Sequence, residues 1–148
     1  METEINNRRI ELLEYFPEED WFNRLPSKNW LCILLTNDTD RKYINELITK
    51  IIEKNVCYVC SIGMQCEKVH DLIDEEISFR ETSTKVKDIP SHFIMTTWHN
   101  NFEEGIWFAF FAAQHEEVEI EKVIIIDMTN GQEIERLENT LYKIKNEG

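Results

Sequence analysis

Four apolar segments alternate with four longer segments of helical periodicity along this 148-residue chain, and this alternation restricts the possible folds most. The first apolar segment, NWLCILLT at 29–36, is a nearly continuous hydrophobic run, typical of a strand that is covered on both faces. Parallel strands need long crossover connections, which are usually helices. The sequence therefore predicts an α/β protein, a three-layer sandwich around a four-stranded, mainly parallel sheet.

The expected elements follow from the periodicity of apolar residues. Strands are predicted at 29–36, 56–62, 92–99 and 122–128, and helices at 41–55, 66–79, 102–115 and 131–148. We expect the strand order 2-1-3-4 in one Rossmann-like or flavodoxin-like domain of residues 29–148. Residues 1–28 are predicted to form a helical segment that packs on this core, with one helix running to about Phe16 before Pro17.

The charge of the chain bears on its partners. The 29 acidic and 16 basic residues give a formal net charge of −13, which repels nucleic acids and anionic membranes. Basic protein surfaces and small ligands stay open as partners. The longest apolar runs are too short to span a bilayer, and no basic segment precedes an apolar run at the start. We therefore expect a cytoplasmic protein.

The four cysteines are expected to be thiols in that compartment. Cys57 and Cys60 form a C-x-x-C pair, which is a known redox arrangement. They lie inside the apolar run NVCYVCSI, however, whereas a redox pair needs an exposed turn at the start of a helix. We interpret both as small residues of the core.

The helix expected at Phe102–His115 is apolar around most of its circumference. A helix with one face in water does not need such a composition. Either the N-terminal segment covers its outer face, or a second copy of the chain does. The sequence favours a homodimer formed through this helix.

A ligand site is expected where the strands end and the helices begin. Parallel sheets bind ligands at the carboxyl ends of their strands, where the strand order reverses. With the order 2-1-3-4, that point lies between 29–36 and 92–99. The segment TTWHNN offers stacking surface and hydrogen-bonding groups for a small polar ligand with a flat group; alternatively, Thr97 or Asn100 caps the next helix and Trp98 lies in the core. The candidate ligand-binding residues are Asn37, Asp38, Ser61, Thr97, Trp98 and His99.

The signatures of common cofactor sites are missing from the sequence. No strand is followed by a glycine-rich dinucleotide loop or a Walker lysine, and neither H-E-x-x-H nor G-x-S-x-G occurs. Cys66, His70 and Asp74 follow one another at four-residue spacing, which suits a soft metal, but a simple His70–Asp74 pair is favoured. We therefore expect no cofactor and no metal, and a conventional nucleotide or zinc enzyme is disfavoured.

Cys66 and His99 form the candidate catalytic pair. A cysteine in the first turn of a helix feels the positive end of the helix dipole, which favours the thiolate, and His99 would serve as its base. Asp38 or Asp127 would orient that base. Alternatively, Cys66 shares a helix face with Val69 and Ile73 and is simply buried.

Two segments, GMQCEKVHDLID and TTWHNNFEEGIWFAFF, are similar to those of a family of small, uncharacterised bacterial α/β proteins known only as a domain of unknown function. The resemblance extends from Trp30 to Asp127. Its most specific parts are Cys66–Glu67–His70–Asp71 and Thr97–Trp98–His99. It implies that the two segments form one site, and it implies no activity.

The sequence thus predicts a small soluble binding or regulatory protein that recognises a small polar ligand or a basic protein. One alternative is a cysteine-dependent hydrolase or transferase that uses Cys66 and His99. Another is an acidic inhibitor or immunity-type protein, which would capture a basic partner through salt-sensitive contacts.

Overall fold

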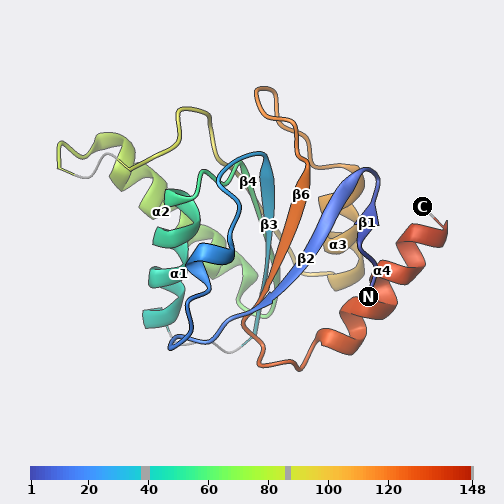
Figure 1. The fold of residues 1–148 in the computed structure, drawn as a ribbon. Helices are drawn as coiled ribbons and strands as arrows, with labels where there is room; N and C mark the ends of the chain where they lie inside the picture. Colours follow the sequence, from blue (N-terminus) through green and yellow to red (C-terminus); the bar gives the residue numbers. More distant parts are fainter. Residues whose placement is uncertain (38–40, 86–87, 148) are drawn as a thin grey trace.

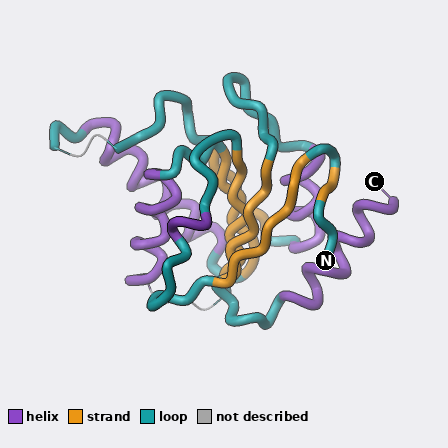
Figure 2. The backbone as a smooth tube through the Cα atoms, viewed as in Figure 1, coloured by secondary structure: helices purple, strands orange, loops and turns teal. Residues whose placement is uncertain are grey.

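A computed structural model describes residues 1–37, 41–85 and 88–147 as a six-stranded sheet between two layers of helices (Figures 1 and 2). The strands are β1 (Glu4–Ile5), β2 (Arg8–Glu14), β3 (Trp30–Thr36), β4 (Tyr58–Gly63), β5 (Met95–His99) and β6 (Lys122–Asp127). The helices are α1 (Arg41–Glu53), α2 (Cys66–Thr82), α3 (Phe102–Phe111) and α4 (Ile134–Glu147), with a short 3-10 turn, η1 (Phe22–Arg24).

Two hydrophobic cores form, one on each face of the sheet. Helices α1 and α2 cover one face, and α3 and α4 cover the other (Figure 1). The alternation along β3 divides its side chains between them: Leu31 and Ile33 belong to the α3–α4 core, whereas Cys32 and Leu34 belong to the α1–α2 core. All seven residues of β3 are buried, as expected for a strand covered on both faces.

The predicted mixed α/β architecture is confirmed, with a sheet that is mostly parallel. Strands β2, β6, β3, β4 and β5 run parallel to one another, and β1 is antiparallel to β2. The prediction of four strands was wrong, because the chain adds β1 and β2 at one edge of the sheet. Within the described residues, no helix is both long and apolar enough to cross a bilayer.

The predicted strand order was also wrong. The sheet order is β1-β2-β6-β3-β4-β5, so that β6 and not β5 lies beside β3. Burial explains the arrangement: five of the six residues of β6 are buried, and its position between β2 and β3 covers both of its edges. None of the residues of β5 is fully buried, and this more polar strand lies at the edge.

The N-terminal segment was predicted to be helical and forms a hairpin instead. Asn6 and Asn7 have φ angles of 51° and 62°, which are the left-handed values of a two-residue turn between β1 and β2. Strand β2 then pairs with β6 along six residues. This pairing satisfies backbone groups of β6 that a helix would leave without partners, and it overrides the local helical preference of residues 8–14.

The hairpin also holds the end of α3. The side chain of Asn6 donates to the carbonyl of Phe110, and the Arg8 guanidinium donates to the carbonyls of Ala109 and Ala113 at 2.5 and 2.6 Å. These bonds satisfy carbonyls that a helix end leaves free. The N-terminal segment therefore covers part of α3, while Trp107 stays 44% exposed.

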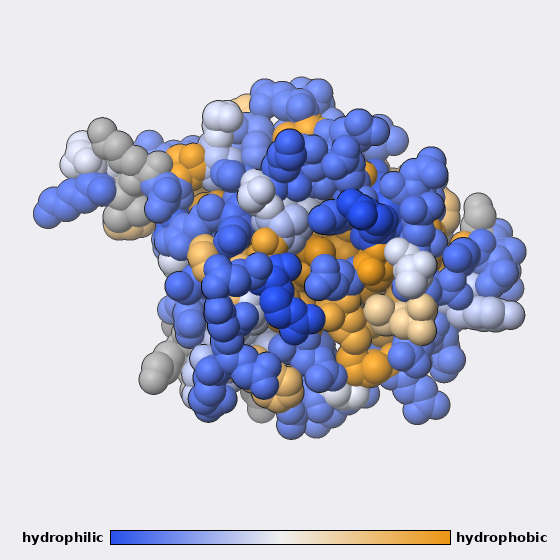
Figure 3. Space-filling model, viewed as in Figure 1, coloured by the Kyte–Doolittle hydropathy of each residue, from blue (hydrophilic) through white to orange (hydrophobic). Residues whose placement is uncertain are grey.

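Figure 3 shows that the face around β2 is largely hydrophilic, with one apolar area over β2 and the adjoining part of α4. Ile10 and Leu12 of β2 are only partly buried and pack against the α3–α4 core. The hairpin thus leaves apolar side chains of β2 partly exposed near this edge of the sheet.

Gly63 allows β3 and β4 to end side by side, and its replacement tests this approach. A Cβ at Gly63 would lie 2.2 Å from the carbonyl oxygen of Thr36, and the φ angle there is +112°. We expect Gly63→Ala to destabilise the protein by at least about 2 kcal/mol more than Gly131→Ala. Gly131 also has a positive φ, +83°, but nothing lies within 4 Å of its Cβ position. Urea unfolding of the two variants measures the difference, and equal losses would contradict this account.

Candidate functional site

A cleft opens where the strand order reverses. From β3 the chain continues outward through β4 to β5, whereas β6 lies on the other side of β3. The carboxyl ends of β3, β4 and β6 therefore border one depression of ≈ 360 Å³. Its lining comprises Leu35, Thr36, Asn37, Ile62, Gly63, Met64, Asn100, Phe102, Thr129, Gln132, Glu133 and Arg136. This is the place where open α/β sheets bind ligands.

The floor of the cleft is held by contacts between the ends of β3 and β4. The Thr36 hydroxyl donates to the carbonyl of Met64 at 3.0 Å, across the turn that begins α2. The same turn contains Gln65 in a left-handed conformation, with φ of 66°. Glycine is thus required at position 63, because a Cβ there would collide with the carbonyl oxygen of Thr36 on the neighbouring strand.

The wall on the β6 side is built around a buried carboxylate. Asp127 accepts hydrogen bonds from the backbone and hydroxyl of Thr129, at 2.9 and 2.5 Å, and from the backbone of Gly131 at 2.9 Å. The Thr129 hydroxyl in turn accepts from the backbone of Glu133 at 3.3 Å. These bonds shape the turn that leads into α4 and place Gln132 and Glu133 at the cleft.

An amide pair spans the cleft. The Asn37 amide, just beyond β3, donates to the side-chain oxygen of Gln132 at 2.7 Å. Gln132 is exposed and Asn37 partly exposed, and both keep further donors and acceptors for a ligand. Asn100, beyond β5, is a third amide of the lining. The arrangement offers neutral hydrogen-bonding groups from three strand ends.

Arg136 contributes a guanidinium that is already paired. It donates to both carboxylate oxygens of Glu103 at 3.0 and 3.1 Å, and it lies 4.5 Å from the centroid of the Phe102 ring. The hydrogen bonds with Glu103 raise the pKa of Arg136 and lower that of Glu103. This pair joins α3 to α4 at the mouth of the cleft, and its charges largely cancel.

The predicted ligand-binding residues do not all meet at this cleft. Asn37 lines it, and Asp38 lies outside the described residues. Ser61 is fully buried in β4, and its hydroxyl has no hydrogen-bond partner among the described residues. Thr97, Trp98 and His99 lie on β5, which β4 separates from β3. Their role in binding stays a prediction.

The two residues of the predicted catalytic pair have different surroundings. The Cys66 thiol is buried on α2 and lies 3.5 Å from the side-chain oxygen of Asn100. The His99 ring lies against Phe108 of α3, on the other face of the sheet, and its Nε2 atom is 2.9 Å from the Thr97 hydroxyl. Burial lowers the pKa of His99. Each group thus has a different polar neighbour, and the use of His99 as a base for Cys66 stays a prediction.

The spacing of Cys66, His70 and Asp74 does not produce a metal cluster. His70 Nε2 lies 3.5 Å from Asp74 Oδ2 and 3.1 Å from the Thr96 hydroxyl, which donates to Asp74 at 2.8 Å. Across the part of the chain that the structure describes, no three His, Cys, Asp or Glu side chains are grouped to hold a metal ion. The His70–Asp74 pair thus ties α2 to β5.

Several residues of the cleft were missed by the sequence reasoning. Gln132, Glu133 and Arg136 follow β6, and they approach β3 only because β6 is its neighbour. The one available signal was the high apolar content of KVIIID, which favours a central strand over an edge strand.

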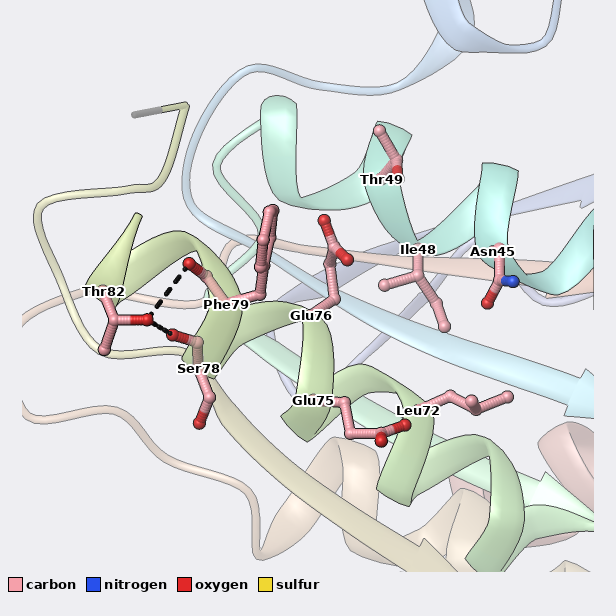
Figure 4. Close-up of a pocket in the computed structure, with 9 residues that line it drawn as sticks. All are labelled: Asn45, Ile48, Thr49, Leu72, Glu75, Glu76, Ser78, Phe79 and Thr82. Carbon is pink, nitrogen blue, oxygen red and sulfur yellow. Dashed lines mark hydrogen bonds between the residues drawn. The ribbon is translucent and has the colours of Figure 1, made fainter. Parts of the chain in front are cut away.

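A larger groove of ≈ 660 Å³ lies between α1 and α2, away from the strand ends (Figure 4). Ile48 and Leu72 line it, and Glu75, Glu76 and Phe79 of α2 stand beside them. Phe79 is 54% exposed. The groove combines an apolar surface with carboxylates, and basic residues are missing from its described lining.

The comparisons with known proteins give a family. A family model described as a domain of unknown function, DUF7684, matches residues 10–144. The chain belongs to this family. No curated protein and no solved structure matches the chain. The family match includes most of β2 and most of α4, so it extends beyond Trp30–Asp127, the range of the expected resemblance.

The reactivity of the thiols distinguishes a catalytic Cys66 from a structural one. All four cysteines are buried, and burial raises the pKa of Cys57 to about 11 and that of Cys60 to about 12. We expect the folded protein to react slowly with Ellman's reagent, and the urea-unfolded protein to release four equivalents. One fast thiol that disappears in Cys66→Ala would instead support the cysteine enzyme.

Proposed function

We propose that this member of the DUF7684 family is a binding protein that holds a small polar ligand in the cleft between the ends of β3, β4 and β6. What carries the proposal is the position of the cleft at the reversal of strand order, together with amides that converge on it from separate strand ends. Asn37 and Gln132 already hydrogen-bond to each other across it.

The chemistry of the lining favours an uncharged or weakly anionic ligand. The amides donate and accept hydrogen bonds, and Phe102 and Ile62 supply apolar surface. The helices α2 and α3 begin at the cleft, so the positive ends of their dipoles favour carbonyl or carboxylate oxygens. A polyphosphate is disfavoured by the net charge of −13 and by the pairing of Arg136 with Glu103.

Ligand-detected NMR with a panel of small amides, carboxylates, sugars and nucleosides tests this function. A compound that binds should perturb the backbone amides of residues 36–37, 63–64 and 129–133 in a labelled protein. We expect Asn37→Leu or Gln132→Leu to weaken its binding about ten-fold or more, since each removes hydrogen bonds to the ligand.

The matched control is Asn23→Leu, which removes an exposed amide outside the cleft that bonds to Asp20. This variant should bind like the wild type. Binding that perturbs other residues, or that survives both cleft substitutions, would contradict the proposal.

The groove between α1 and α2 supports a second function, the capture of a basic protein segment with an apolar anchor. Glu75 and Glu76 complement basic side chains, while Ile48, Leu72 and the exposed Phe79 offer apolar contact. Such a function would suit the regulatory or inhibitor-type protein that the sequence predicts. Glu76 is partly engaged by Arg80, to which it is bonded at 2.9 Å, so Glu75 is the freer carboxylate.

A synthetic amphipathic peptide of lysine and leucine, with a fluorescent label, probes this groove. We expect it to bind with an affinity that falls as salt rises, and Phe79→Ser to weaken binding about ten-fold, because an exposed aromatic anchor is lost. Phe93→Ser is the control, since Phe93 is also exposed but does not line this groove. Equal loss in both variants would show that the peptide binds without using the groove.

A further inference from the structure

Strand β5 forms one edge of the sheet. It pairs with β4, and within the described residues no strand lies on its other side. The backbone of Met95 donates toward β4, to the carbonyl of Cys57 at 3.0 Å. Because neighbouring residues of a parallel strand direct their backbone groups to opposite sides, Thr96 and Trp98 direct theirs to the open edge. The edge therefore offers two donors and two acceptors.

This edge lacks the features by which proteins prevent edge-to-edge pairing. Such edges usually carry a lysine, a proline, a bulge or an inward-pointing charge. Residues 89–102 contain no Asp, Glu, Lys or Arg, and they form the longest such run in the sequence. Inside this run, Met95 is 45% exposed and Trp98 37% exposed. An uncharged edge strand with exposed Met95 and Trp98 side chains is suited to pairing.

The charge of the whole chain indicates which partner fits. Two copies with a formal net charge of −13 each repel one another over most of their surfaces. Two such copies approach each other with the least electrostatic repulsion at an uncharged strand. It offers no charge to select a basic or an acidic partner, and a strand edge is self-complementary under a two-fold rotation.

We propose that β5 pairs with β5 of a second copy of this chain, antiparallel about a two-fold axis at Thr97. In this register the backbone of Thr96 exchanges two hydrogen bonds with the backbone of Trp98 in the second copy. The two-fold axis repeats this exchange between Trp98 and the second copy's Thr96. The two Thr97 residues face each other as the pair without hydrogen bonds. The two sheets become one, and Met95 packs near the second copy's His99.

This interface differs from the dimer through α3 that the sequence predicted. The described residues of the hairpin already occupy the carbonyl end of α3 through Asn6 and Arg8. Trp107 stays exposed on α3 and stacks on Phe111, with 5.9 Å between the ring centroids. Trp107 is therefore a matched exposed residue that separates the two interfaces. The pairing of β5 is independent of the ligand cleft.

Two carboxylates flank the edge and determine how salt acts on the dimer. Asp74 is bonded to the Thr96 hydroxyl at 2.8 Å, and Glu104 interacts electrostatically with His99. Pairing brings these charges toward their counterparts in the second copy. Salt screens that repulsion, so the dimer strengthens as ionic strength rises, whereas a dimer held by ion pairs would weaken. A short two-stranded contact falls near the small end of stable interfaces, so the dissociation constant is expected to be micromolar.

Sedimentation equilibrium of the full chain across micromolar concentrations, at about 20 mM and about 500 mM NaCl, tests the proposal. We expect a monomer–dimer equilibrium with a several-fold lower dissociation constant at high salt. Met95→Glu should raise that constant about ten-fold or more, because it places a carboxylate beside the second copy's His99, close to the Glu104 that interacts with that histidine. Trp107→Glu makes the same change at an exposed apolar residue of α3 and should leave the constant unchanged.

Hydrogen exchange supplies a second measurement that does not depend on a variant. The amides of Thr96 and Trp98 should exchange more slowly as protein concentration rises, while those of Trp107 and Phe108 should not respond. A protein that stays monomeric at the highest concentration and salt overturns the proposal. So does a dimer that Trp107→Glu dissociates and Met95→Glu does not.

Discussion

The pairing of β3 with β6 is the contact on which the rest of the structure depends. It places a strand from late in the chain at the centre of the sheet and leaves β5 at the edge. It also creates the reversal of strand order, and with it the cleft where Asn37 meets Gln132. The close end of β3 against β4, which only a glycine at 63 permits, completes the floor of that cleft. The position of the cleft and the position of β5 at the edge therefore both follow from the pairing of β3 with β6.

Electrostatics divides the surface into regions with different uses. Most of the chain is acidic, and the groove between α1 and α2 shares this character through Glu75 and Glu76. The charged groups at the mouth of the cleft at the strand ends are paired, because Arg136 bonds to Glu103 and lies 3.8 Å from Glu133. The edge strand is without charged residues. A small polar ligand, a basic segment and a second copy therefore suit three separate places.

The polar groups that look reactive in the sequence have structural partners. The buried Cys66 thiol meets Asn100, and His99 meets Thr97 and Phe108 on the opposite face. His70 and Asp74 join Thr96, which fastens α2 to β5. Burial raises the pKa of Cys57 and Cys60, in agreement with their interpretation as core residues. A dense polar segment can thus reflect the demands of connecting a helix to a strand.

The sequence by itself determined the elements of the α/β core and their alternation, because apolar periodicity reports directly which residues need burial. The four helices predicted within residues 29–148 are present, and the predicted strands contain β3, nearly all of β4, β5 and β6. The tertiary structure alone decided the strand order, the cleft residues after β6, and the strand conformation of residues 8–14. Apolar periodicity indicates that a strand is buried, but it does not indicate which strand pairs with it. Arg8–Glu14 forms a strand because it pairs with the otherwise open edge of β6, and paired backbone groups outweigh a weak local preference for helix.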